Sequence, residues 1–286
     1  GQALAASARS LDPWSAVDDL TPGHAGLRRQ IALRYLAAGM PVSADDIVIT
    51  NGALEALNLC LTAVTRAGDA VLVESPTFYA ALQSLERMGL HAIEVPTHPR
   101  EGIALAALEA AIVRHRPQAC WLMTTFQNPL GSLMPEAKKK ALVALITRHQ
   151  LPLIEDDVYA ELYLGDQRPL PAKAFDTEGL VLHCSSFSKS LAPGYRIGWA
   201  TPGRYVPEFQ AALEALQPGE ISEPLVSRFG VHLIQLLERR QVELSQREQR
   251  DMVRDTVREK KLDQAYATWL QELRARAYVE YRDAPQ

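Results

Sequence analysis

The first 205 residues alternate short apolar runs with amphipathic segments. Seven runs of β-type residues, bounded by Gly, Pro or polar residues, predict strands over 45–52, 69–75, 91–97, 119–125, 151–157, 179–186 and 195–200. Apolar residues at helical spacing predict helices between them, over 54–65, 79–88, 104–114 and 136–149. Near-continuous apolar strands separated by helices predict an α/β fold with a mostly parallel, seven-stranded sheet that helices cover on both faces.

The last 81 residues have a different pattern. They hold 12 basic and 14 acidic residues, whereas residues 1–205 hold 18 and 20. This shift in charge density predicts two units of different architecture. We expect a short helix over 208–216, a turn at Pro218-Gly219, a strand over 229–237 and an amphipathic helix over 242–276. The long helix needs a partner surface, or alternatively forms a coiled seam in a dimer.

Composition narrows the class of protein. The chain has 286 residues, of which 47% are hydrophobic and 22% charged, and this excludes a disordered chain. Its formal charge of −4 gives no basic field for nucleic acid or an anionic membrane. We expect no membrane span and no signal peptide. Cys60, Cys120 and Cys184 lie in apolar stretches, so we expect reduced core thiols and a cytoplasmic location.

Unusual polar residues follow the predicted strands. They are Asn51-Gly52, Ser75 to Phe78, Phe126 to Pro129, Asp156-Asp157 with Tyr159, and Ser185 to Lys189. Because active sites of parallel sheets lie at the carboxyl ends of the strands, we expect these residues to converge there.

Lys189 differs from the other lysines of residues 1–205. We expect Lys138, Lys139 and Lys140 to form a solvated helix face, and Lys173 to lie at the surface of a proline-rich loop. Lys189 instead follows an apolar strand, where burial would desolvate its ammonium group and lower its pKa. Such a lysine can attack a carbonyl and form a Schiff base, although a partly buried structural lysine is the alternative.

The surroundings of Lys189 suit a phosphate group. Ser186, Ser188 and Arg196 offer hydroxyl and guanidinium donors. Gly52 and Ala53 open the helix after the first strand, and small residues there leave backbone N–H groups free to face an anion. The alternative for the Gly-Ala pair is simple packing.

Other strand ends suit an aromatic ring. Asp156 can keep a pyridinium nitrogen protonated, Phe78 can stack on the ring, and Asn128 and Tyr159 can hydrogen-bond a phenolic oxygen. Each has an alternative, since Phe78 also suits a core and Asp156 a helix cap. Their order along the strand ends favours one shared site.

Five strings carry a family resemblance: IVITNGALEAL (47–57), VESPTFY (73–79), FQNPLG (126–131), LIEDDVYAEL (153–162) and SSFSKSLAPGYRIGW (185–199). Residues 1–205 resemble the large domain of the fold-type I pyridoxal-phosphate aminotransferases, and more narrowly the aminotransferase-like module of MocR-type GntR regulators. The resemblance implies pyridoxal 5'-phosphate as cofactor and Lys189 as the Schiff-base lysine. It places Asp156 at the pyridine nitrogen, Asn128 and Tyr159 at the phenolic oxygen, and Phe78 on the ring. It also implies that the phosphate is bound by Gly52, Ala53, Ser186, Ser188 and Arg196.

The resemblance also implies partners. We expect an amino acid or oxo acid as substrate, and a homodimer if the family interface survives. Lys189, Asp156 and Tyr159 are the expected catalytic residues. The winged helix-turn-helix of MocR regulators and the aminotransferase small domain are not recognised here, so we expect no DNA binding and impaired turnover.

The C-terminal part carries a second resemblance. Residues 206–241, with LQPGEISEP and FGVHLIQLLERR, resemble half of a parvulin-type peptidyl-prolyl isomerase, and 242–286 resemble the end of the periplasmic SurA chaperones. We therefore expect a chimera joined near 198–206. Because the isomerase pocket is incomplete, His232 is expected to be structural. A chaperone or isomerase-like role, or that of a MocR regulator fragment, is the alternative function.

These patterns define four expected segments. Residues 1–44 form an N-terminal arm and first helix, and 45–205 form the pyridoxal-phosphate domain. Residues 206–241 form the partial parvulin-like segment, and 242–286 form the C-terminal helix and tail.

Overall fold

An eight-stranded sheet forms the core of the part of the chain that the structure describes. The computed structural model describes residues 22–40, 42–165, 167–202, 216–217, 219–227 and 230–233. The strands of the sheet are β1 (Val48–Thr50), β2 (Ala70–Ser75), β3 (His91–His98), β4 (Gly102–Ile103), β5 (Ala119–Leu122), β6 (Leu153–Asp156), β7 (Val181–Ser186) and β8 (Gly198–Thr201). Their order is β1-β8-β7-β6-β5-β2-β3-β4. All seven predicted strands are present.

The sheet is mostly parallel, as expected, but it has eight strands rather than seven, and two of them, β8 and β4, run against the others. Strands β3, β2, β5, β6 and β7 pair in parallel, with registers such as Asp156 opposite Cys184. Strand β8 runs antiparallel to both β1 and β7. The eighth strand, β4, pairs antiparallel with β3 through only two residues, too few to give a hydrophobic pattern.

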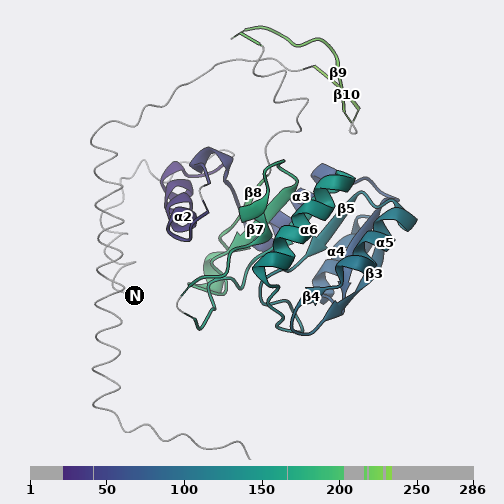
Figure 1. Cartoon of the computed structure of the whole chain (residues 1–286). Helices are drawn as coiled ribbons and strands as arrows, with labels where there is room; N and C mark the ends of the chain where they lie inside the picture. Colours follow the sequence, from purple (N-terminus) through teal and green to yellow (C-terminus); the bar gives the residue numbers. More distant parts are fainter. Residues whose placement is uncertain are drawn as a thin grey trace, which may run out of the picture. The chain divides into compact units, whose positions relative to one another are not determined.

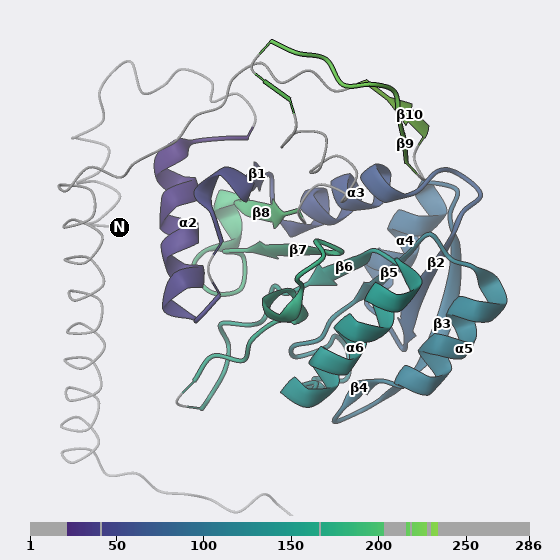
Figure 2. The same ribbon diagram turned by 45° about the horizontal axis from the view of Figure 1, so that its top comes forward.

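Helices cover both faces of the sheet. They are α2 (Ala25–Ala37), α3 (Ala53–Val64), α4 (Tyr79–Arg87), α5 (Leu105–His115) and α6 (Glu136–His149), with short 3-10 helices at Ala44–Asp46, Ala172–Phe175 and Pro193–Tyr195. Figures 1 and 2 show α5 and α6 on one face and α3 and α4 on the other. The four helices predicted between strands are therefore confirmed, within one residue at each end.

Each face has its own core. Leu108 of α5 and Leu142 of α6 pack with Leu72 and Leu153 on one face. On the other face, Leu57 of α3 packs with Val71, Val73 and Trp121. A third cluster lies beneath α2, where Tyr35 packs with Ile47, Phe187 and Trp199. The central strands β2, β5, β6 and β7 are buried from both sides, as their near-continuous apolar runs predict, whereas β3 is largely exposed.

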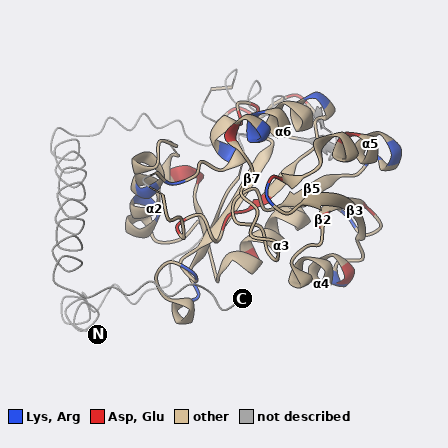
Figure 3. Ribbon diagram, turned by 60° about the horizontal axis from the view of Figure 1, so that its bottom comes forward, with Lys and Arg blue, Asp and Glu red and all other residues tan. Residues whose placement is uncertain are grey.

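Two lysines lie elsewhere than expected. Figure 3 shows Lys and Arg residues in blue on α5 and α6. Lys140 of α6 is exposed and forms an ion pair with Glu136. Lys139, however, is only 1% exposed, so its assignment to a solvated face is wrong. Lys173 is half-buried rather than at the surface, because its Nζ donates to the carbonyl of Val181 at 2.7 Å and to Asp176 at 3.2 Å.

Beyond β8 the structure describes a two-stranded hairpin. Strand β9 (Leu225–Ser227) pairs antiparallel with β10 (Gly230–His232). The predicted helices over 208–216 and 242–276, and Pro218 of the predicted turn, lie outside the described residues. Only Gly230 to Leu233 of the predicted strand over 229–237 is described.

The three cysteines are free and buried, as predicted. The Sγ atoms of Cys60 and Cys184 lie 3.5 Å apart between α3 and β7. Among the described residues, no helix is both long and apolar enough to span a bilayer.

Candidate functional site

The predicted site residues share one edge of the sheet. Strands β2, β5, β6 and β7 are parallel, so their carboxyl ends meet at this edge. Strand β1 runs in the same direction, because β8 is antiparallel to both β1 and β7. Ligands of open α/β sheets bind beyond such carboxyl ends. We refer to this place as the carboxyl edge.

Asp156 ends the central strand β6 at the carboxyl edge. It is buried, and its Oδ1 accepts no hydrogen bond from the described residues. Burial, with a smaller contribution from the neighbouring charge of Asp157, raises the pKa of Asp156 to about 7. A buried carboxyl group with a free oxygen is suited to a cationic or N–H-bearing ligand.

Lys189 lies in the turn after β7 and is exposed. The expectation that the strand end buries its amine is therefore wrong. Its Nζ lies 5.7 Å from the centroid of the Tyr159 ring, a cation–π distance. The structure thus brings together two predicted site residues, the lysine and the tyrosine that follows β6.

At the start of α3 the backbone lies close to the side chain of Arg196. Gly52 has φ of +86° and caps α3 without a side chain, and the first-turn N–H groups of α3 follow it. The Arg196 guanidinium donates to the Asn51 carbonyl at 3.5 Å, and a Cβ on Gly52 would lie 2.5 Å from Nη2 of Arg196. Ser186 Oγ accepts the N–H of Ser188 at 3.3 Å. Arg196 and the α3 terminus together can hold an anion.

Phe78 and Asn128 lie on neighbouring segments of the same edge. Both are half-buried. The Phe78 ring meets Tyr79 edge-on with centroids 5.0 Å apart, and the Asn128 N–H donates to Met123 Sδ at 3.5 Å. Gln127 links the two segments, because its Nε2 donates to the Pro76 carbonyl at 2.8 Å.

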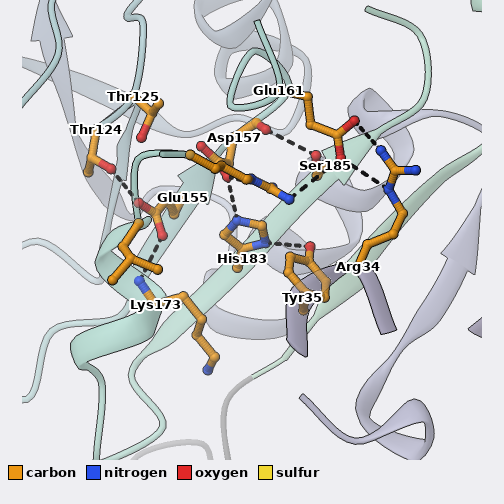
Figure 4. Close-up of polar contacts among 12 residues, drawn as sticks. Arg34, Tyr35, Thr124, Thr125, Glu155, Asp157, Glu161, Lys173, His183 and Ser185 are labelled. Atoms are coloured by element: carbon orange, nitrogen blue, oxygen red, sulfur yellow. Dashed lines mark hydrogen bonds and ion pairs between the residues drawn. The ribbon is translucent and has the colours of Figure 1, made fainter. Parts of the chain in front are cut away.

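A buried polar chain behind Asp156 is absent from the sequence prediction. The indole N–H of Trp199 donates to the Tyr35 hydroxyl at 2.6 Å, which lies 3.1 Å from His183 Nδ1. His183 Nε2 lies 2.9 Å from Asp157 Oδ2 (Figure 4). The indole can only donate, so a consistent chain has Tyr35 donating to Nδ1 and Nε2–H donating to Asp157. Burial raises the pKa of Tyr35, which keeps this hydroxyl protonated.

Charged residues extend this chain to the segment after Tyr159. Arg168 Nη2 lies 3.9 Å from Asp157 Oδ2, and its Nη1 lies 3.5 Å from Glu161 Oε1. Arg34 of α2 forms an ion pair with Glu161 (Figure 4). Helix α2 is therefore joined to the segment that carries Tyr159.

A second missed cluster surrounds Glu155, the register partner of His183 on β7. The buried carboxylate of Glu155 accepts the Thr124 hydroxyl and the N–H groups of Ala172 and Lys173, the latter two at 2.7 and 2.9 Å. Lys139 Nζ donates to Thr125 Oγ1 at 2.8 Å, and burial lowers the pKa of Lys139. These bonds fix the Thr124-Thr125 segment that precedes Asn128.

The carboxyl edge thus combines a buried acid with a free oxygen, an exposed amine near a phenol ring and a glycine-capped helix start beside an arginine. Such a set can bind a ligand with a ring nitrogen at one end and a phosphate at the other.

Comparison with known proteins agrees with this chemistry. The family model "Aminotransferase class I and II" matches residues 20–271. The HTH-type transcriptional regulator YdcR of Escherichia coli K12 is 46% identical over 282 residues, covering 94% of this chain and 60% of the regulator. The α-aminoadipate aminotransferase LysN of Thermus thermophilus, solved with N-(5'-phosphopyridoxyl)-L-leucine, superposes with a TM-score of 0.59. It is 34% identical, over 64% of this chain and 46% of LysN.

The chain also matches a chaperone. Chaperone SurA of Albidiferax ferrireducens is 63% identical over 97 residues, covering 34% of this chain and 21% of SurA. Because the YdcR match covers 94% of the chain, the two matched segments overlap. The chain spans no more than 60% of the length of these three proteins.

Proposed function

We propose that residues 45–205 form a pyridoxal-phosphate domain. The basis is that the chain belongs to the class I and II aminotransferases. Pyridoxal phosphate is the cofactor that this family membership indicates, and a phosphopyridoxyl group is bound in the related LysN structure. The proposed substrate is an amino acid or oxo acid.

The fit of the site to this cofactor supports the proposal. Asp156 Oδ1, buried and without a partner among the described residues, is the observation that carries it, because a pyridine nitrogen would give this oxygen a hydrogen-bond partner. Arg196 and the start of α3 would hold the phosphate, together with Ser186 and Ser188. Phe78 would lie on the ring, and Asn128 and Tyr159 would bind its phenolic oxygen.

Lys189 has the proposed catalytic role. The cofactor supplies an aldehyde and an electron-withdrawing ring. The amine of Lys189 would condense with the aldehyde carbon with loss of water. Once the amino group of a substrate takes its place, the freed amine would move the proton at the substrate Cα as general acid and base. Asp156 would hold the ring nitrogen protonated, and Tyr159 would orient the ring.

The first prediction concerns cofactor binding. Titration of the full chain with pyridoxal phosphate should produce a new visible absorbance band that saturates. Lys189→Ala should abolish this band, whereas Lys140→Ala, which removes an exposed amine on α6, should leave it unchanged. A band that persists in Lys189→Ala would exclude Lys189 from the proposed role.

A regulatory role is the second candidate, favoured by the match to YdcR over 94% of this chain. In this reading the chain is the cofactor-binding module of a transcriptional regulator. It would bind pyridoxal phosphate and an amino acid without releasing an oxo acid. Multiple-turnover assays with amino acid mixtures distinguish the two candidates, because an enzyme converts substrate in excess of protein.

The SurA match also bears on the origin of the two C-terminal segments, 206–241 and 242–286. We propose that they derive from a SurA-like sequence joined near 198–206, supported by the 63% identity. Light scattering of an aggregating test protein measures any chaperone activity of the full chain. Unchanged scattering at stoichiometric excess would contradict a chaperone role.

A further inference from the structure

Glu74 is a second buried acid at the carboxyl edge. It lies on β2, is 1% exposed, and its Oε2 accepts the N–H of Met123 at 2.9 Å. Its Oε1 is buried and has no hydrogen-bond partner among the described residues. Glu74 therefore links the end of β2 to Met123, the first residue after β5, through this hydrogen bond.

Gln127 makes the second connection between these segments. It is also 1% exposed. Its Nε2 donates to the Pro76 carbonyl at 2.8 Å, and its Oε1 accepts the N–H of Leu130 at 2.9 Å. Its own N–H donates to the Ser132 carbonyl at 3.0 Å. One side chain thus fixes both the turn after β5 and the segment after β2.

Both connections lead directly to the proposed ring contacts. Met123, which Glu74 binds, accepts the Asn128 N–H through its sulfur. Gln127 precedes Asn128 in the chain, and Pro76, which it binds, lies two residues before Phe78. Buried hydrogen bonds of this kind hold binding groups to within a fraction of an ångström.

The charge state of Glu74 distinguishes it from an ordinary hydrogen-bond acceptor. Burial raises its pKa to about 8 and the nearby Asp156 adds to the rise, while the hydrogen bond from the Met123 N–H acts in the opposite direction. Glu74 is therefore mainly neutral at pH 7. Its ionisation at higher pH places a charge within the carboxyl edge.

We propose that Glu74 and Gln127 are positioning residues that hold Asn128 and Phe78 in place for the cofactor ring. This inference rests on the proposed binding of pyridoxal phosphate. It assigns to Glu74 an indirect role, through Met123, with no contact to the cofactor.

Three variants test the inference in the full chain. Glu74→Ala removes the acceptor of the Met123 N–H. Glu74→Gln keeps an acceptor but cannot ionise. Glu94→Ala is the matched control, because Glu94 is an exposed acid on the neighbouring strand β3. Pyridoxal-phosphate affinity is measured by absorbance from about pH 6 to about pH 9, and folding is checked by circular dichroism.

We expect Glu74→Ala to weaken cofactor binding about tenfold, the effect of losing one buried hydrogen bond, while Glu94→Ala binds as the unaltered chain does. Glu74→Gln should bind within about twofold at pH 7, and its affinity should change less with pH near pH 8 than that of the unaltered chain, because Glu74 no longer titrates there.

Two results would overturn this inference and leave the proposed function intact. One is a folded Glu74→Ala variant with unaltered affinity. The other is a Glu74→Gln variant whose affinity follows pH as in the unaltered chain, and this result decides the matter if Glu74→Ala does not fold. Failure of the unaltered chain to bind pyridoxal phosphate would instead overturn the proposed function, and this inference with it.

Discussion

Asp156 and Glu74 are carboxyl groups that the fold removes from water at the same edge of the sheet. Desolvation is the largest cause of the raised pKa in both, which is about 7 for Asp156 and about 8 for Glu74. Each also keeps one oxygen without a partner among the described residues. Isolated buried acids cost stability, so their retention at one edge is consistent with a ligand that uses Asp156.

The raised pKa of Glu74 predicts a pH-dependent stability. In the unfolded chain a glutamate has a pKa of about 4.3, so between that pH and about 8 the folded state binds more protons than the unfolded state. The free energy of unfolding therefore falls as pH rises through this window. We expect the cofactor-free chain to melt at a lower temperature near pH 8 than near pH 5.

Glu74→Gln removes this titration and should narrow the difference between the two melting temperatures, measured by circular dichroism. Glu94→Gln is the control, because Glu94 is exposed. Equal pH dependence in Glu74→Gln and the unaltered chain would contradict the assignment of a raised pKa to Glu74.

Single residues also show where sequence patterns mislead. Three consecutive lysines suggest a solvated face, yet Lys139 aligns with Leu142, Val143 and Ile146 at spacings of three, four and seven, and all four are buried. The helical period therefore predicts its burial, and only the residue type hides it. Lys189 is the opposite case, because it is expected to be buried and is exposed. An apolar strand does not ensure that the turn that follows the strand is buried.

At the scale of elements, the start of α3 and the start of β8 are in backbone contact. A Cβ on Gly198 would lie 2.3 Å from the Gly52 carbonyl carbon and 2.5 Å from the Ala53 nitrogen. Neither backbone atom can move without displacing the helix terminus that, with Arg196, forms the proposed phosphate site. A glycine at 198 is therefore required by packing.

Gly198→Ala tests this contact. We expect the free energy of unfolding to fall by about 1–3 kcal/mol, because the overlap is with backbone, and cofactor affinity to fall with it. Gly194→Ala is the matched control, since a Cβ there meets no atom within 4 Å. Urea unfolding measures the stability, and absorbance titration measures the affinity. A Gly198→Ala variant as stable as Gly194→Ala would show that the contact is looser than described.

Periodicity predicts the main elements well and their pairing less well. The strands and the four helices between them follow from apolar runs and helical spacing. The antiparallel direction of β8 does not follow, because direction depends on the path of the chain between β7 and β8 rather than on the residues within either strand. Strand β4 consists of two residues, which carry no period.

At the scale of the whole molecule, polar residues distant in sequence assemble behind the site. Tyr35, Asp157, His183 and Trp199 come from four separate elements or loops and form one buried chain. No local pattern links them, so this part of the site could not be predicted from sequence. The residues at strand ends could be, because topology alone brings parallel carboxyl ends together.

Large apolar side chains near the carboxyl edge are exposed. They follow Tyr159 and Lys189 in the chain and are Leu162, Leu164, Leu191 and Tyr195. Exposed apolar side chains favour association. We expect the chain to self-associate, with sedimentation velocity showing a species larger than a monomer and Leu191→Lys shifting it toward the monomer. A monomer at every concentration, with no binding of an apolar dye, would contradict this.

The central claim is that Lys189 is the residue that pyridoxal phosphate modifies. The direct measurement is to load the full chain with the cofactor, trap the bond with borohydride and locate the added phosphopyridoxyl mass by peptide mapping. We expect this mass on the peptide that contains Lys189 and on no other lysine. The mass on Lys139, Lys140 or Lys173 instead, or no added mass at saturating cofactor, would contradict it.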